Sequence, residues 1–245
     1  MLIKKIFLAA MMLVPAAAFG ESAAHLDHAG TDINNQASLQ RGARNFVNYC
    51  LGCHSAKYVR WNRVGADLGI SEEDLQQNLM FTGGKPFDTM QSAMPHAQAI
   101  EWFGVAPPDL SLIARSRGVD YLYTFLRSFY ADASRPNGVN NLVLPNAAMP
   151  HVLADLQGVR TARIELVTHD GQATPHIVGL ADGAPGTLSA EEYDSFVRDT
   201  VNFLDYIGEP VKAKRQSMGI WVVLFLMVFW LFTYLLKKEY WKDIH

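Results

Sequence analysis

Hydrophobic residues form one unbroken run near each end of the chain and a periodic pattern between the two runs. The first run spans residues 6–18, follows Lys4 and Lys5, and leads to the small residue Gly20. About a dozen apolar residues behind a short basic stretch are typical of a secretory signal peptide, and they are fewer than the roughly 20 that cross a bilayer. We therefore expect residues 1–20 to be a cleaved signal peptide, with the mature chain outside the cytoplasm.

The second apolar run, residues 218–236, has the length and composition of a transmembrane helix. It contains no charged side chain, and Trp221, Trp230 and Tyr234 are aromatic residues of the kind that membrane interfaces favour. Basic residues flank it on both sides, so the positive-inside rule does not orient it, whereas an exported N-terminus does. We expect an exported domain over 21–217, an anchor over 218–236 and a cytoplasmic tail over 237–245.

Apolar residues between the two runs recur mostly at helical spacing. The pattern predicts helices in five places: over about 38–49, from Ser71, from Pro107-Pro108-Asp109, over 120–130, and from Ser189, which can cap a helix with Glu192. Partial alternation over 159–178, around a turn at Asp170-Gly171, predicts a β-hairpin. We expect a mainly α domain with a small β-hairpin insertion and an irregular loop over 135–150.

The only two cysteines lie in the stretch Cys50-Leu51-Gly52-Cys53-His54. A redox-active dithiol would follow a strand, but the pattern before this stretch is helical, and a structural zinc site needs four protein ligands. Two cysteines followed directly by histidine are the attachment signature of a c-type haem, whose iron the histidine binds. We therefore expect one covalently bound haem c, held by Cys50, Cys53 and His54 in a cytochrome c-like domain.

The second axial ligand of such a haem has two candidates. Met94 and Met149 each stand directly before a Pro-His pair. A methionine ligand raises the reduction potential of a haem, as electron-transfer cytochromes require. Local spacing is the same at both positions, so it does not choose between them.

The first and last helices of the exported domain both offer an apolar face. In the first helix this face includes Ala43, Phe46 and Val47, with Gly42 beside it. These faces suit two helices that pack across each other, which would clamp the haem from its edge, but they also suit packing against other elements.

Charge in the exported part argues against a nucleic-acid partner and suits basic ones. Between the two ends there remain 16 Lys and Arg against 22 Asp and Glu, which gives this part a formal charge of about −6. Nucleic-acid-binding domains carry the opposite sign.

Five stretches of the mature chain together resemble the cytochrome c1 family, the haem subunit of quinol–cytochrome c oxidoreductase, in its bacterial form. They are NYCLGCHS, LGISEEDLQQNLMFTGGKPFDTM, WFGVAPPDLSLIARSRG, SRPNGVNNLVLPNAAMPHVL, and IGEP with KRQSMG ahead of the membrane helix. The Pro-Pro-Asp-Leu-Ser segment, the Arg-x-Arg after it and the C-terminal anchor are its most specific features. The resemblance implies a single-pass protein of the cell inner membrane, with its haem domain in the periplasm and its C-terminus in the cytoplasm.

The resemblance also implies further site residues. In the family the distal iron ligand is the methionine after the Asn- and Pro-rich loop, which here is Met149 rather than Met94. The family places an arginine of the Arg-x-Arg pair near a haem propionate, and Arg117 matches that position better than Arg115. Some members support the haem pocket with a disulfide, which this chain lacks the cysteines to form.

The implied function is electron transfer within a dimeric complex, and the chain is not an enzyme by itself. An electron from the Rieske iron–sulfur protein would pass through the haem to cytochrome c, beside a cytochrome b subunit. Two alternatives stay open: a free-standing membrane-anchored shuttle that serves a terminal oxidase, and a peroxidase or gas sensor with an open sixth position on the iron.

Overall fold

The computed structural model describes residues 25–169 and 172–243, so the expected signal peptide at 1–20 and the turn Asp170-Gly171 lie outside the described residues. The elements in chain order are α2 (Gln36–Tyr49), β1 (Ala56–Arg60), α3 (Trp61–Leu68), α4 (Glu72–Asn78), β2 (Thr89–Met90), α5 (His96–Phe103), α6 (Ile113–Arg117), α7 (Val119–Arg127), β3 (Phe129–Ala131), β4 (Val139–Asn141), α8 (Ala154–Gln157), β5 (Gly158–His169), β6 (Gln172–Pro185), α9 (Ala190–Gly208) and α10 (Lys212–Tyr240). Helices dominate, as the periodicity predicts.

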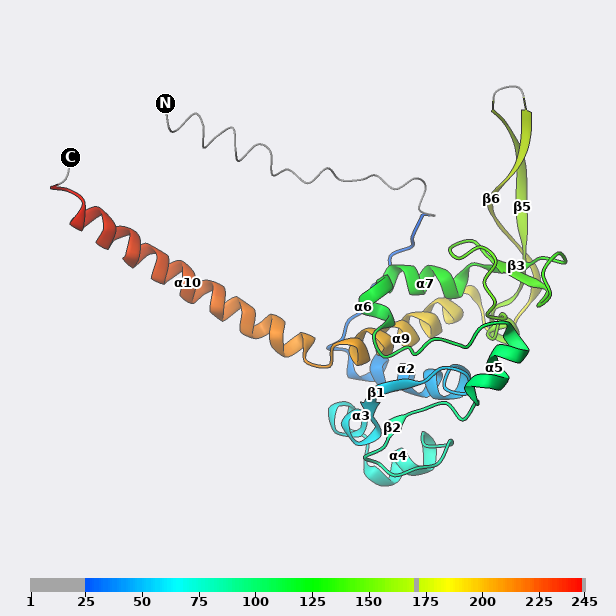
Figure 1. The fold of residues 1–245 in the computed structure, drawn as a ribbon, viewed down its shortest axis with the longest axis horizontal. Helices are drawn as coiled ribbons and strands as arrows, with labels where there is room; N and C mark the ends of the chain where they lie inside the picture. Colours follow the sequence, from blue (N-terminus) through cyan, green and yellow to red (C-terminus); the bar gives the residue numbers. More distant parts are fainter. Residues whose placement is uncertain (1–24, 170–171, 244–245) are drawn as a thin grey trace.

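The core of the domain forms where α2 and α9 cross, as Figure 1 shows. A Cβ atom at Gly42 would lie 2.0 Å from the carbonyl oxygen of Asp199, so only glycine allows the two backbones to approach this closely. Phe46 and Phe203, both fully buried, lie beside the crossing with ring centroids 5.6 Å apart. The expected packing of the first and last helices of the domain is confirmed.

Polar side chains fix the register of this crossing. Asp199, with only 7% of its surface exposed, accepts hydrogen bonds from Ser38 Oγ and Arg41 Nε at 2.6 Å each. Asn45 Nδ2 on α2 donates to Thr200 Oγ1 on α9 at 3.2 Å. Burying a polar group costs free energy unless the group is paired. These contacts therefore favour one register of α2 against α9 over registers shifted along the helix axes.

Local signals predict the starts of two helices correctly. Ser189 and Glu192 form the expected reciprocal capping box at the start of α9, and the Ser71 hydroxyl accepts from the Asp74 N–H at the start of α4. The helix expected from Pro107 begins only at Ile113, because Asp109 and Leu110 form hydrogen bonds with Lys57 and Ser55 instead.

The expected β-hairpin is present and longer than the alternation indicated. β5 and β6 pair antiparallel from Gly158↔Pro185 to His169↔Gln172, and β5 also joins β3 in a sheet of order β4-β3-β5-β6. The ribbon projects well beyond the helices in Figure 1. The helix expected over 120–130 ends at Arg127, since Phe129 begins the strand that pairs with β4.

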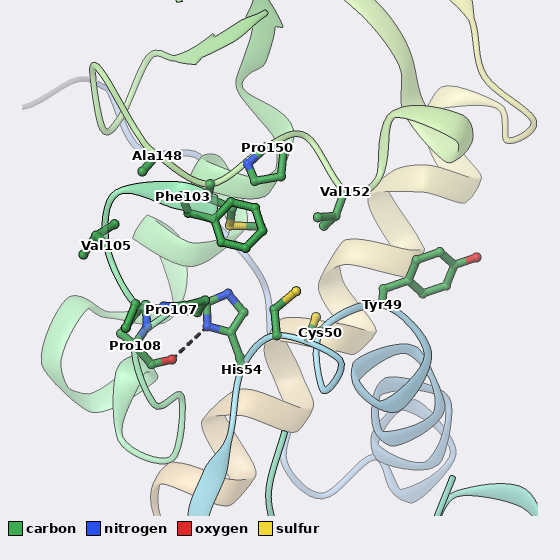
Figure 2. Close-up of a pocket in the computed structure, with 13 residues that line it drawn as sticks. Tyr49, Cys50, His54, Phe103, Val105, Pro107, Pro108, Ala148, Pro150 and Val152 are labelled. Atoms are coloured by element: carbon green, nitrogen blue, oxygen red, sulfur yellow. Dashed lines mark hydrogen bonds between the residues drawn. The ribbon is translucent and has the colours of Figure 1, made fainter. Parts of the chain in front are cut away.

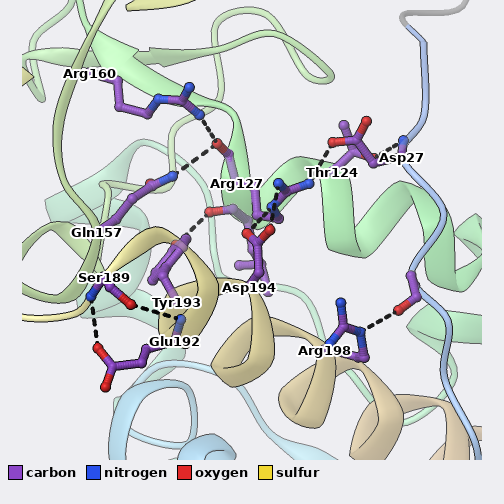
Figure 3. A network of polar contacts seen from close by, with 12 residues as sticks. Asp27, Thr124, Arg127, Gln157, Arg160, Ser189, Glu192, Tyr193, Asp194 and Arg198 are labelled. Carbon is purple, nitrogen blue, oxygen red and sulfur yellow. Dashed lines mark hydrogen bonds and ion pairs between the residues drawn. The ribbon is translucent and has the colours of Figure 1, made fainter. Parts of the chain in front are cut away.

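Arg127 ties the hairpin and the N-terminal segment to α9 (Figure 3). Its carbonyl oxygen accepts from Gln157 Nε2 at 3.1 Å and from Arg160 Nη1 at 3.2 Å, both at the base of the hairpin. Its guanidinium binds Asp194 on α9 at 2.6 Å and Asp27 at 2.5 Å. One residue thus joins three segments that are far apart in sequence.

The apolar run near the C-terminus lies within α10, which leaves the domain as a separate rod in Figure 1. This helix of 29 residues has a mean hydropathy of 2.3 in its most apolar window, none of which is buried in the protein. It begins at Lys212, ahead of the expected anchor, and Lys212 Nζ binds Asp205 of α9 at 2.8 Å. Its length and exposure are those of a membrane anchor.

Candidate functional site

The cysteine pair lies in a tight turn at the end of α2. Cys50 caps this helix, and its carbonyl oxygen accepts hydrogen bonds from the N–H groups of Cys53, at 3.0 Å, and His54, at 2.8 Å. Both thiols are free. The turn brings Cys50, Cys53 and His54 to the wall of one cavity (Figure 2).

This cavity has about 640 Å³ of empty space, part of it open to solvent. Three segments line it almost wholly with apolar side chains: residues 49–54, 103–108 and 148–152. An apolar wall with few polar groups is typical of cofactor sites. Two thiols beside an imidazole, with a methionine thioether on another wall, are a donor set that fits a c-type haem.

The backbone fixes the orientation of the His54 ring. Its Nδ1 lies 2.8 Å from the carbonyl oxygen of Pro108, and since a carbonyl only accepts, Nδ1 carries the proton (Figure 2). Burial lowers the pKa of His54, against the opposing effects of this hydrogen bond and of Asp109. A neutral ring with a protonated Nδ1 leaves the Nε2 lone pair free to bind a metal.

The segment that carries the Pro108 carbonyl is itself tied to the chain after the histidine. The carboxylate of Asp109 accepts from the N–H groups of Lys57 at 2.9 Å and Ser111 at 3.0 Å. Ser111, fully buried, accepts from the Tyr58 N–H through its hydroxyl at 3.1 Å. Sequence reasoning missed this role, although it used the same Pro-Pro-Asp-Leu-Ser segment as a mark of resemblance.

The structure separates the two methionine candidates. Met149 lines the cavity that Cys50, Cys53 and His54 also line. Met94 lies in another hollow, which Cys53 also lines but His54 does not, and its N–H donates to Ser92 Oγ at 3.1 Å. Only Met149 therefore shares a cavity with the histidine.

Neither alternative use of the cysteines gains support. Burial, with the neighbouring Cys53 as a lesser cause, raises the pKa of Cys50 to about 12, whereas a catalytic dithiol needs a lowered one. Within residues 25–169 and 172–243, no three side chains of His, Cys, Asp or Glu are grouped to hold a metal ion.

Comparison with known families shows to which family the chain belongs. The model described as the Cytochrome C1 family matches residues 28–244, nearly the whole chain. The chain belongs to the cytochrome c1 family.

The relatives include proteins with two different names. The chain is 49% identical to "Cytochrome c1" of Allochromatium vinosum, over 99% of its own length and 100% of that protein. It is 48% identical to "Ammonia monooxygenase gamma subunit" of Nitrosomonas europaea, over 98% of each chain. The match to "Cytochrome c1, heme protein, mitochondrial" of Saccharomyces cerevisiae is 28% identical and covers 86% of this chain and 68% of that protein.

Membership in the cytochrome c1 family confirms the resemblance seen in the motifs and the mainly α fold with one C-terminal apolar helix. It makes the protein a haem-binding electron carrier and a subunit of the cytochrome bc1 complex, not an enzyme by itself.

Arg117, the expected propionate partner in this cytochrome c1 family member, lies at the end of α6 and outside the cavity wall described above. Its guanidinium carbon is 5.5 Å from the centre of the Tyr121 ring, and the side chain is exposed. Arg115, two residues earlier, instead packs beside Gly208 at the end of α9. The side chains of Arg115 and Arg117 therefore both lie at the surface.

Asparagines shape the loop that carries Met149. Asn137 Nδ2 points at the carbonyl oxygens of residues 147–149 and reaches that of Met149 at 3.4 Å. Asn140 Oδ1 accepts from the N–H of Asn146 at 2.7 Å, where the backbone takes a left-handed φ of 65° that asparagine tolerates. The asparagine content of 135–150 was visible in the sequence, but the partners of each amide were not.

Proposed function

We propose that the chain binds one haem c covalently through Cys50 and Cys53, with His54 and Met149 as the two axial ligands. The single observation that carries this proposal is the cavity that all four side chains line. When bound, the haem supplies a one-electron couple between ferric and ferrous iron. The protein's own contribution is to aim His54 through Pro108 and to keep water from the site with apolar walls.

A methionine thioether and an apolar wall both favour the reduced state of a haem, because neither stabilises the additional positive charge of ferric iron. The site is therefore suited to accept electrons at a high potential. Val105 and Val152, two of the lining residues, are 55% and 36% exposed, so the cavity reaches the protein surface where a redox partner can approach.

The relay that we propose takes one electron from the Rieske protein and passes one electron to a cytochrome c, so the haem returns to its starting state each cycle. The haem domain would lie in the periplasm, with α10 in the inner membrane and the C-terminus in the cytoplasm. The complex would be dimeric. Support comes from family membership, from the exposed apolar α10 and from the apolar run that precedes the domain.

We also assign Arg117 to a haem propionate, because it matches the family's Arg-x-Arg position. Its exposed side chain is free to turn from Tyr121 toward a carboxylate. Arg117→Gln should change the reduction potential of the haem, since it removes a fixed positive charge near the iron, whereas Arg115→Gln should change it less. Equal shifts of the reduction potential in the two variants would reject this assignment.

The ligand assignment is tested by a matched pair of variants, Met149→Leu and Met94→Leu. Loss of the sulfur ligand removes the weak long-wavelength absorption band of ferric His/Met haem and lowers the reduction potential. We expect both changes in Met149→Leu and neither in Met94→Leu. A band retained in Met149→Leu would refute the assignment, and a fully open sixth site in the wild type would support a ligand-binding haem protein.

Purification from detergent-solubilised membranes tests the relay. Cytochrome b and an iron–sulfur protein should co-purify with the chain. Isolation of the chain alone would instead support the free-standing shuttle to a terminal oxidase. Because one relative bears the name of an ammonia monooxygenase subunit, recovery with a monooxygenase is a third outcome that would reject the relay.

A further inference from the structure

His151 lies two residues after Met149 and faces away from the cavity. Pro150 and Val152, on either side of it, line the cavity, and Figure 2 shows both at the edge of the site. The ring of His151 instead stacks on the ring of Phe129, with centroids 4.9 Å apart and planes 6° from parallel. Phe129 is 1% exposed, so the imidazole rests on a surface that belongs to the core.

This stack is the end of a longer row of rings. Phe129 meets Phe125 edge-on at 5.1 Å, and Phe125 stacks on Tyr121 at 6.3 Å. Tyr121 and Phe125 are four residues apart on α7, so the helix holds them on one face. The row therefore connects a rigid helix to the segment that carries Met149.

In the described part of the chain, the imidazole of His151 has one polar neighbour, the side chain of Gln157. The Nε2 atom of the imidazole is buried and has no hydrogen-bond partner in the described part of the chain. A buried polar atom without a partner costs free energy, and a phenyl ring of similar shape would avoid this cost. The ring-to-ring contact of the residue is the stack on Phe129.

The other Met-Pro-His triplet of the chain, at residues 94–96, lacks this arrangement. His96, two residues after Met94, is exposed and begins α5. The two triplets are the same in sequence and different in surroundings, so His96 offers a natural control for His151.

We propose that His151 is a positioning residue for Met149: its stack on Phe129 holds the Met149-Pro150 segment so that the thioether stays at the haem iron. This inference rests on the proposed ligation by Met149. Pro150 transmits the restraint, because its ring fixes the backbone angle φ between the two residues. Asn137 restrains the same segment from the Met149 carbonyl, and His151 restrains it from the other side.

The test uses the full chain with its haem and compares the wild type with His151→Ala, His151→Phe, His96→Ala and Met149→Leu. The readouts are the long-wavelength band of the ferric protein and the reduction potential, which loss of stability alone does not change. His151→Ala should give a roughly twofold to tenfold larger fraction of ferric protein without the sulfur ligand, the range that loss of one aromatic pair allows. Its potential should fall with that fraction.

His151→Phe keeps a ring on Phe129 and should behave as the wild type, as should His96→Ala. A wild-type band and potential in His151→Ala would overturn the inference, and so would a His151→Phe variant as impaired as His151→Ala. If Met149→Leu also kept the band, the proposed ligation itself would fail. If Met149→Leu lost the band while His151→Ala kept it, the ligation would stand and only the role of His151 would be rejected.

Discussion

The carbonyl oxygen of Pro108 determines which nitrogen of His54 faces the cavity. A proton on Nδ1 satisfies that carbonyl at 2.8 Å and leaves Nε2 as the only ring nitrogen with a free lone pair. Water can replace the Pro108 carbonyl as the hydrogen-bond partner of His54 unless the backbone around this carbonyl is fixed. Asp109 supplies that restraint, because both of its carboxylate oxygens accept backbone N–H groups.

Replacement of Asp109 should therefore destabilise the haem domain. Asp109→Ala removes two charge-assisted hydrogen bonds, and we expect the free energy of unfolding to fall by about 2 kcal/mol. Asp109→Asn keeps one acceptor oxygen and should lose about half as much. Urea unfolding of the full chain in detergent, followed by haem absorbance, measures both. Equal midpoints for the wild type and both variants would contradict this account.

At the scale of elements, the crossing of α2 and α9 depends on one position without a side chain. Gly42→Ala places a methyl group 2.0 Å from the Asp199 carbonyl oxygen, and backbone cannot move aside as a flexible side chain can. We expect a loss of about 3 kcal/mol in the free energy of unfolding. Alanine is the better helix former by about 1 kcal/mol, so helix propensity alone predicts the opposite sign.

Gly219→Ala is the matched control, since nothing lies within 4 Å of a Cβ at this position in α10. It should leave the urea midpoint of the haem domain unchanged. A Gly42→Ala protein as stable as the wild type would show that the helices can separate at little cost, and the crossing would then not be the centre of the fold.

Signals within a few residues of each other predicted the elements best. The capping box of Ser189 and Glu192 requires only neighbouring residues, and α9 begins where it predicts. The Pro107-Pro108-Asp109 segment carries the same kind of helix-start signal, yet no helix begins there, because Asp109 and Leu110 form hydrogen bonds with the distant residues Lys57 and Ser55. Such partners are invisible in a linear pattern, which is also why the sequence offered both Met94 and Met149 and left the role of Asn137 unseen.

At the scale of the whole molecule, the hairpin is an appendage to the haem domain. From Arg163 outward the recorded pairs of β5 join it only to β6, whereas Thr161, nearer the base, also pairs with Ala131 of β3. Removing residues 164–177 and closing the strands with Asn-Gly should therefore leave the haem spectrum and the urea midpoint unchanged. A variant that fails to bind haem would show that the outer hairpin supports the site. Arg127→Ala is the contrasting change, because it releases α9 and the N-terminal segment from the guanidinium, while the backbone carbonyl that holds the hairpin base remains.

The charge between the two apolar runs bears on how fast a soluble acceptor docks. A formal charge of about −6 between the two apolar ends attracts a basic cytochrome c over several ångströms, and dissolved salt screens that attraction. The second-order rate of reduction of a basic cytochrome c should therefore fall steadily between low and physiological ionic strength, while an acidic cytochrome c should show the opposite trend. Stopped-flow measurement of the reduction rate with the purified complex distinguishes these two trends. A rate that does not change with salt for either acceptor would mean that the surface charge does not steer the encounter, and that apolar contact around the cavity mouth at Val105 and Val152 governs docking instead.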